Sequence, residues 1–482
     1  MKYRQPLRTL LTVTVSSLAI GCSAGPDFQR PSPPTQAGYL LPHDEAHQPT
    51  SPPQTLSLQW GKDLPAQWWE LFHSPAITAL VTRAIAENPD IQAAQQALTV
   101  ARENVAAAHA ANWPTVNAEL NPTRTKTSTA LSAVPANNAR YYTLHTAQLS
   151  INYVLDLWGA NRRQVESLQA QAEQQRFVYE ATYLTLTSNV VNAAIQDAAL
   201  HAQIALENRI IAAQRAILAT SQRLSDAGQL AQIDVLLQQD ALAQAQTTLN
   251  GLEKSAQQQH DLVAALSGGF PNQPTPSVTL QTIATPRNIP VSLPLQLAQQ
   301  RPDMRAAEAN WHAVSAQYGV AVANRLPNLT LSGNIGSSAI TVRELMTSGQ
   351  GIWAIAAQLT QPLFDGGALR HRQRAAAAAV AQAAAAYRGV LVTAFQNVAD
   401  SLHALQLDAQ LVSDNQAALD RANRTLAIAQ QQLHLGDLAD TVVQQSVINH
   451  AQSEIALIQA QTNQLTDTVA LFQALGGGWW NR

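Results

Sequence analysis

One stretch of the sequence occurs twice, and this duplication limits the possible folds more than any other feature. Residues 87–91, Glu-Asn-Pro-Asp-Ile, recur as residues 300–304, Gln-Arg-Pro-Asp-Met, 213 positions later (302 − 89). A second offset, of 208 positions (436 − 228), superposes Gly228 on Gly436. A period of about two hundred residues is too long for a solenoid, whose repeats span roughly 20 to 50 residues. The chain therefore contains two copies of one structural unit.

The two copies, at 61–270 and 271–482, each end in a long helix and a shorter returning helix. Residues 160–226 contain neither proline nor glycine, the residues that interrupt helices. At 1.5 Å per residue, this stretch predicts a helix about 100 Å long. Its counterpart, 368–435, contains one glycine and no proline. The returning helices are expected at 230–267 and 440–474.

Apolar residues recur every seven positions in the long helices. Such a repeat, sustained without caps over about sixty residues, is typical of coiled coils and predicts a left-handed superhelical packing seam. The seam consists of Leu391, Val398, Leu405, Val412, Leu419, Leu426 and Leu433, with Ile204, Ile211 and Leu218 as counterparts in the first copy. The long helices are therefore expected to pack along their length against other helices.

Ahead of the long helices, each copy has a medium helix and then two segments in which polar and apolar residues alternate. The helices are expected near 75–111 and 303–325, and the strands at 115–125, 143–157, 328–336 and 352–363. A period of two predicts strands with unlike faces. The polar face carries Glu119, Gln148, Ser150 and Asn152. Strands of about ten residues with this pattern are typical of membrane barrels, and a soluble sheet with one wet face is the alternative.

Four strands are too few to close a barrel by themselves. Open sheet edges in lipid leave backbone groups unpaired, at a cost of several kcal/mol each, so membrane strands require oligomerisation. No segment after residue 22 is expected to be apolar enough for a membrane-spanning helix. The predicted fold class is mainly α and internally duplicated. Long coiled-coil helices form an α-barrel, and four strands per chain contribute to a trimeric, twelve-stranded membrane β-barrel that encloses a pore.

The only cysteine, Cys22, follows a short basic and apolar N-terminal segment. Residues 1–21 have the layout of a secretory signal and are too short to span a membrane. The sequence Ala-Ile-Gly-Cys at 19–22 resembles a bacterial lipobox, which implies that Cys22 is lipidated, and an ordinary signal with an incidental cysteine is the alternative. Residues 22–60 are then a proline-rich, lipid-anchored strap. A single cysteine also excludes a disulfide within the chain.

Several function classes are disfavoured by composition. The formal net charge is −3 and no basic run is present, so nucleic-acid binding is not expected. His43 and His47 lie four residues apart, but in a proline-rich stretch rather than on a helix, so no metal site is predicted. No nucleophile elbow or phosphate-binding loop occurs. We therefore expect no enzymatic activity and no cofactor.

These features together resemble one family. The duplicated helix–strand–strand–long-helix unit, the lipobox followed by Gly-Pro-Asp-Phe-Gln-Arg-Pro at 25–31, and the paired glycines that end each copy are similar to the outer-membrane factors, the TolC-like channels, in their OprM/NodT lipoprotein branch. The resemblance implies a homotrimer in the outer membrane with a periplasmic α-barrel. It also implies a passive exit duct for small molecules, docked to a periplasmic adaptor and an inner-membrane transporter of the RND type or another type.

The turns between the long and returning helices are the candidate functional sites. Glycine supplies the positive φ that such a reversal needs, which alone explains Gly228 and Gly436. The resemblance implies that these tips receive the adaptor and narrow the periplasmic entrance. Candidate adaptor contacts are Leu224, Asp226, Gly228 and Gly436, and candidate gate residues are Leu433, Leu435, Asp437 and Asp440. The alternative for the two acids is an ordinary charge interaction with the next helix N-terminus.

Two other functions remain open from the sequence. The same barrel would serve as the outer-membrane duct of a type I protein secretion system. A structural coiled-coil lipoprotein of the periplasm is the alternative from another class, and it predicts no conductance and no β-structure.

Overall fold

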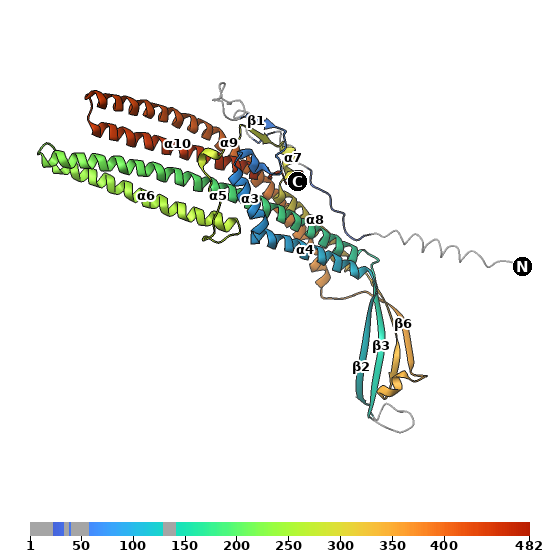
Figure 1. The fold of residues 1–482 in the computed structure, drawn as a ribbon. Helices are drawn as coiled ribbons and strands as arrows, with labels where there is room; N and C mark the ends of the chain where they lie inside the picture. The colour runs from blue at the N-terminus through green and yellow to red at the C-terminus, as the bar shows by residue number, and fades with distance from the viewer. Residues whose placement is uncertain (1–22, 33–37, 40–56, 129–140) are drawn as a thin grey trace. The chain divides into compact units, whose positions relative to one another are not determined.

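The computed structural model describes residues 23–32, 38–39, 57–128 and 141–482 (Figure 1). The chain divides into two compact units, and each unit takes segments from both sequence copies. Unit 1 comprises Leu98–Gln174, Ala307–Tyr387 and the described part of Met1–Arg30. Unit 2 comprises Gln175–Ala306, Arg388–Arg482 and the described part of Pro31–Ala97. The duplication is thus a repeat of elements and not a pair of separately folded halves.

Unit 1 contains an antiparallel sheet of four strands in the order β2-β3-β5-β6. The strands are β2 (Thr115–Lys126), β3 (Tyr141–Leu155), β5 (Asn328–Ala339) and β6 (Gly351–Thr360). Strand β3 of the first copy pairs directly with β5 of the second copy. Within the described residues, β2 and β6 each pair on one side only, so both outer edges of this sheet carry unpaired backbone groups.

Strands β3 and β6 end earlier than the sequence predicts. Strand β3 ends at Leu155 because the Asp156 carboxylate accepts two backbone N–H bonds, both at 3.0 Å, from the first turn of the next helix. Strand β6 ends at Thr360, two residues before Pro362, which has no N–H to continue a strand ladder. In both cases the alternation of polar and apolar residues continues past the last paired residue.

The long helices follow the predicted ranges. They are α5 (Ala160–Asp226) and α9 (Ala368–Leu435), and the returning helices are α6 (Gln232–Leu266) and α10 (Asp440–Ala474). Every residue of the predicted seven-residue seam is buried or half-buried, and Val398 is completely buried. The heptad pattern thus identified the packed side of both long helices.

The helix predicted at 75–111 in the first copy is two helices in the structure, whereas the helix predicted at 303–325 in the second copy is present and has an unpredicted short helix before it. In place of 75–111 there are α3 (Pro75–Glu87) and α4 (Pro89–His109). The second copy has α7 (Pro294–Gln300) ahead of α8 (Pro302–Ala323). Proline fits the first position of a helix but not its interior, and it pushes the preceding residue into an extended conformation. The helix must therefore restart at each proline.

The residue before each proline contacts the end of the returning helix, and we call these two contacts the proline joints. Asn88 Nδ2 donates to Leu266 O at 3.1 Å, and Arg301 Nη1 donates to Ala474 O at 2.9 Å. Carbonyls in the last turn of a helix have no partner within the helix itself. In each proline joint a side chain thus donates a hydrogen bond to the last carbonyl of the returning helix. The donor is the Asn88 amide in the first copy and the Arg301 guanidinium in the second.

A left-handed glycine completes each proline joint. Gly268 has φ +77° and Gly476 has φ +94°. A Cβ at Gly268 would lie 2.7 Å from the Glu87 carbonyl carbon, and one at Gly476 would lie 2.7 Å from Gln300 O. Glycine is the residue type that tolerates both the positive φ and so close an approach of a neighbouring backbone.

Unit 2 has an aromatic core near the proline joints. Trp68 and Phe72 belong to the short helix η1 (Trp68–Phe72) and contact Phe472 of α10, with ring centroids 5.7 and 6.2 Å apart. A two-stranded parallel sheet, β1 (Ser57–Trp60) with β4 (Asn288–Val291), adds Ile289 and Val291 to the same cluster. The last four residues of the predicted strap, 22–60, form β1, a strand that the sequence pattern did not predict.

Among the residues that the structure describes, one helix is apolar enough over part of its length to cross a membrane by composition. Helix α9 contains an 18-residue window with mean hydropathy 1.4, of which 11% is buried, contrary to the expectation for residues after Cys22. The helix is rich in alanine at 375–386 and has 68 residues, more than three times the about 20 that span a bilayer. Alanine adds little bulk, so the exposed part of this stretch suits close packing against another helix.

Candidate functional site

The four predicted polar strand residues lie on one face of the sheet. Glu119 stands opposite Gln148, and their register places Ser150 and Asn152 on the same face. Gln148 Nε2 donates to Glu119 Oε2 at 3.1 Å, and Ser150 Oγ donates to Glu119 Oε1 at 2.8 Å. Asn334 Nδ2 of β5 extends the row by donating to Gln148 Oε1 at 3.0 Å. This face is hydrophilic, with one carboxylate held by neutral donors.

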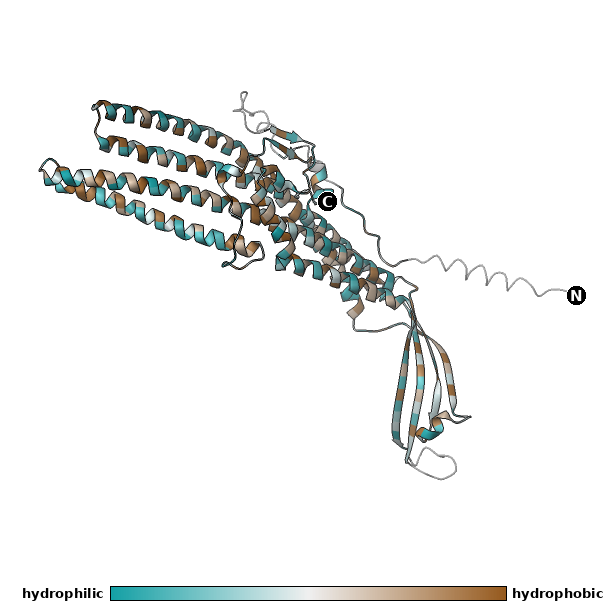
Figure 2. Cartoon of the chain, in the orientation of Figure 1, coloured by the Kyte–Doolittle hydropathy of each residue, from teal (hydrophilic) through white to brown (hydrophobic). Residues whose placement is uncertain are grey.

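The opposite face of the sheet is apolar and exposed. Leu149 of β3 stands opposite Ile335 of β5, which in turn stands opposite Trp353 of β6. Trp353 is 74% exposed and Ile355 is 83% exposed. Figure 2 shows hydrophobic and hydrophilic residues alternating along the strands. A continuous apolar face of this kind requires a cover of lipid or of other apolar side chains.

The second helix hairpin brings the four candidate gate residues together. The turn after α9 is closed by the Asp437 N–H, which donates to Gln432 O at 3.0 Å, and Gly436 has φ +81°. Leu435 is 69% exposed, both acids are exposed, and Leu433 is half-buried. Asp440 begins α10 and accepts a hydrogen bond from Gln444 Nε2 at 3.3 Å. Asp440 thus lies in the first turn of α10, where the helix-end interpretation expects it, and its role at the gate stays a prediction.

The first hairpin differs from the second in its exposed side chains. Its tip contains the predicted residues Leu224, Asp226 and Gly228, all exposed. Next to the tip, α6 exposes an apolar ridge, defined as Ile233, Leu236 and Leu237. The 208-residue offset superposes this ridge on Thr441, Gln444 and Gln445 of α10. The ridge was not predicted from the sequence, although its i, i+3, i+4 spacing is the pattern that binds a partner helix.

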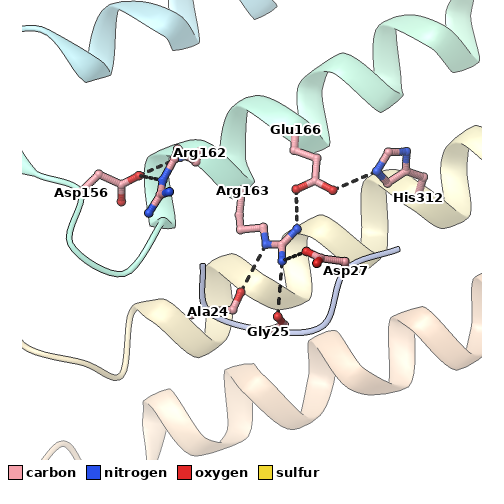
Figure 3. Close-up of polar contacts among 8 residues, drawn as sticks. All are labelled: Ala24, Gly25, Asp27, Asp156, Arg162, Arg163, Glu166 and His312. Atoms are coloured by element: carbon pink, nitrogen blue, oxygen red, sulfur yellow. Dashed lines mark hydrogen bonds and ion pairs between the residues drawn. The ribbon is translucent and has the colours of Figure 1, made fainter. Parts of the chain in front are cut away.

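A buried arginine in unit 1 holds the segment that follows Cys22 (Figure 3). Arg163 of α5 is 4% exposed, and its guanidinium donates to the Asp27 and Glu166 carboxylates at 2.6 Å each. It also donates to the carbonyls of Ala24 and Gly25, both at 3.3 Å. Burial alone would lower the pKa of Arg163, but the two carboxylates raise it above its ordinary value. We call residues 23–30 the docked segment.

The docked segment also packs against α8. The Phe28 ring stacks on the His312 ring, with centroids 4.6 Å apart, and meets the Trp311 ring edge-on. His312 Nε2 lies 2.9 Å from Glu166 Oε1, which ties this stack to the Arg163 network. The sequence showed the Gly-Pro-Asp-Phe-Gln-Arg-Pro stretch but gave no signal that one arginine, 136 positions from Asp27, would hold it.

Two carboxylates meet between α9 and α10. Asp408 is 6% exposed and hydrogen-bonds to Asp467. Burial, together with the hydrogen bond to Asp467 and the negative charge of Asp467, raises the pKa of Asp408 to about 7. The pair therefore holds a proton that an exposed aspartate would release near pH 4.

We expect the substitution Asp408→Asn to flatten the pH dependence of stability. The folded protein binds more protons than the unfolded chain between about pH 4 and the folded pKa of about 7, so stability falls as pH rises through this window and levels off above it. Thermal unfolding at about pH 5 and about pH 8 measures the difference. The matched control is Asp414→Asn, at an exposed position of the same helix. An unchanged pH difference in Asp408→Asn would contradict the prediction.

The predicted lipidation site and the two histidines of the strap lie outside the described residues. Cys22 therefore stays a prediction, as does the absence of a metal at His43 and His47. Among the residues that the structure describes, no group of three or more His, Cys, Asp or Glu side chains could hold a metal ion.

The chain is similar to known proteins over nearly its whole length. The family model "Outer membrane efflux protein" matches residues 80–269 and 293–477. The pyoverdine export outer membrane protein OpmQ of Pseudomonas putida is 30% identical over 480 residues, which cover 98% of this chain and 97% of OpmQ. The probable efflux pump outer membrane protein TtgC of the same species is 27% identical, with 98% and 96% covered.

Solved structures share the fold. The outer-membrane channel OprN has a TM-score of 0.80 at 24% identity, and the match covers 95% of this chain and 100% of OprN. The CmeC outer membrane channel of Campylobacter jejuni has a TM-score of 0.82 at 19% identity, with 95% of each chain covered. The two matched segments of the family model correspond to the two sequence copies, so the duplication is a property of the fold.

Proposed function

Because this chain belongs to the outer membrane efflux protein family, we propose that three copies assemble into the outer-membrane channel of an efflux system. The observation that carries the proposal is the four-stranded sheet of unit 1, with its polar face, its exposed apolar face and its two open edges. Unpaired edges are too costly in lipid, so the strands of one copy need partners from the next. Twelve strands enclose an aqueous pore, whereas four cannot.

In this assembly the apolar face of the sheet meets lipid and the polar face lines the pore. Glu119, Gln148, Ser150 and Asn152 then present one acid and several neutral groups to the passing solute. Such a lining distinguishes solutes by size and charge rather than by shape. The channel is a passive duct, and its substrates are small molecules driven by an energised partner.

We assign the partners to the hairpin tips. A periplasmic adaptor is expected to bind at Leu224, Asp226, Gly228 and Gly436, and through it an inner-membrane transporter of the RND type or a related type delivers the substrate. Exposed apolar side chains at the first tip and next to it support a helical partner there. The lipid on Cys22 would hold the N-terminus at the outer membrane.

Mass and conductance test the assembly. Detergent-extracted protein should have a mass near three chains of about 50 kDa, contain both helix and sheet, and form pores in planar bilayers. A stable monomer with the full β-structure would contradict the edge argument. A protein without conductance would favour the structural lipoprotein instead. In cells that lack their own efflux channel, restored tolerance to small toxic compounds separates efflux from the secretion of a protein substrate.

We expect the second hairpin to form the constriction of the closed channel. Three copies of Asp437 or Asp440 close to a threefold axis would attract cations, while Leu433 maintains the packing above them. Neutralising the acid nearest the axis should therefore weaken cation preference, measured as the reversal potential under a salt gradient for Asp437→Ala and Asp440→Ala. A charged residue at Leu433 or Leu435 should raise leak conductance.

The matched control for the gate is Asp226→Ala at the first hairpin, which removes an acid at a tip that is not expected to close the pore. If Asp437→Ala and Asp440→Ala both keep the wild-type conductance and reversal potential, these acids are only helix-end charges and the constriction lies elsewhere.

A further inference from the structure

The apolar face of the sheet changes character toward the end that lies away from the helices of unit 1. Along β2 this face runs Val116, Ala118 and Leu120, and then Pro122, Arg124 and Lys126. Strand β3 changes in the same way, because His145 stands opposite Pro122 and Tyr141 stands opposite Lys126. We call Arg124, Lys126, His145 and Tyr141 the outer-rim patch. It continues the face that the proposed function turns toward lipid.

The outer-rim patch is basic, and its two cations are exposed. Arg124 and Lys126 are both exposed, and the Lys126 ammonium lies 5.5 Å from the centre of the Tyr141 ring. Neighbours two positions apart on a strand, and diagonal neighbours on paired strands, lie roughly 7 Å apart. The side chains of Arg124 and His145 are such a diagonal pair. One group of phosphate size can therefore contact both.

Within the described strands, no negative charge on the same face balances the patch. None of the residues that the registers place on this face of the four strands is acidic, and Glu119 lies on the opposite face. The connection between β5 and β6 contains the short helix η4 (Val342–Met346), in which Arg343 and Glu344 offset each other. The patch thus keeps an excess of positive charge at the boundary between an apolar surface and the far end of the strands.

We propose that the outer-rim patch binds the phosphate groups of the phosphorylated glycolipid in the outer leaflet of the outer membrane. With the helices in the periplasm, this end of the strands reaches the outer leaflet. Leu120, Leu149 and Ile335 would contact the acyl chains, while Arg124 and Lys126 meet the phosphates above them. Arginine forms paired hydrogen bonds with phosphate oxygens, and clusters of basic residues beside an apolar surface recognise anionic headgroups.

A less specific reading is that the two cations only extend their charged ends into water at the membrane surface. That reading predicts no preference between a phosphorylated lipid and the same lipid without phosphate. His145 and Tyr141 lie beside the two cations, where apolar residues would be expected if the cations only reached into water. This arrangement favours a specific polar site for phosphate. Discrimination between the two lipids therefore separates the two readings.

The test uses the full-length channel in detergent and two probes, bis-phosphorylated lipid A and the same lipid A after removal of its phosphates. Native mass spectrometry measures how much of each lipid stays bound. Wild-type protein should prefer the phosphorylated form by about tenfold or more, and Arg124→Gln/Lys126→Gln should lose most of that preference. Each single substitution should lose part of it. Arg102→Gln, at an exposed position of α4, is the charge-matched control and should bind as the wild type does.

The inference rests on the proposed function, because it uses the membrane orientation of the channel. Bilayer conductance distinguishes a failure of the proposed function from a failure of the lipid-binding inference. The double variant should conduct as the wild type does, so absent conductance in the wild type would count against the proposed function. Equal binding of both lipids by the wild type, or an undiminished preference in the double variant, would overturn the inference even if the pore conducts normally.

Discussion

Replacing Gly476 by alanine should lower the free energy of unfolding by about 3 kcal/mol and remove most of the assembled channel. The residue has φ +94°, a conformation that costs an L-residue about 1–2 kcal/mol. The added Cβ would also lie 2.7 Å from Gln300 O and 3.1 Å from the carbonyl carbon, both backbone atoms that cannot rotate away. Relief requires that the proline joint opens, with loss of the bond from Arg301 to Ala474 O.

The chain provides a matched control in Gly389. This glycine lies within α9, and a Cβ there would meet no atom within 4 Å. Gly389→Ala should therefore leave stability unchanged or raise it by up to about 1 kcal/mol. Chemical denaturation and the yield of heat-resistant oligomer measure both variants. Equal behaviour of Gly476→Ala and Gly389→Ala would show that the proline joint has room for a side chain at Gly476.

Replacing Arg163 by methionine should release the docked segment from unit 1. The substitution leaves two carboxylates and two carbonyls without their donor, and removing one partner of a buried ion pair costs about 3–5 kcal/mol. Asp27 is largely exposed, so its ion pair with Arg163 contributes little to stability. We therefore expect Arg163→Met to lower the free energy of unfolding by about 2–3 kcal/mol in total. Chymotrypsin cleavage after Phe28 reports release, because this ring is stacked on His312 in the docked state.

The neighbouring arginine is the control for this experiment. Arg162 pairs with Asp156 at 3.4 Å and is 47% exposed, so Arg162→Met should cost less than about 1 kcal/mol and leave Phe28 protected. If cleavage after Phe28 is as slow in Arg163→Met as in Arg162→Met, the aromatic stack alone holds the docked segment.

The sequence predicted most of the long elements because their signals are local. The ends of α5, α9 and α10 follow from where helix-breaking residues stand, and the heptad seam identified their packed sides. The period of two assigned Glu119, Gln148, Ser150 and Asn152 to one face, and the strand registers confirm that they share it. Both kinds of signal repeat over ten residues or more, so single exceptions do not hide them.

The features that the sequence did not predict depend on contacts between distant residues. Strands β1 and β4 have four residues each and pair across more than two hundred positions, too short for a periodic pattern. Arg163 sits in an ordinary polar helix start, and only the fold shows that the docked segment covers it. The break at Pro89 could have been predicted from the sequence, because the stretch that occurs in both copies, 87–91 and 300–304, contains the two prolines of the proline joints. Repetition there marked a turn between helices rather than the start of one helix.

The unlike hairpins have a consequence for symmetry. Three copies would set six helix hairpins around a threefold axis, and hairpins with the apolar ridge of Ile233, Leu236 and Leu237 would alternate with hairpins that present Thr441, Gln444 and Gln445. The adaptor proposed to bind at these tips would then meet two chemically different surfaces in every copy of the chain, one apolar and one polar. Identical adaptor molecules bound at the two kinds of hairpin would therefore differ in affinity.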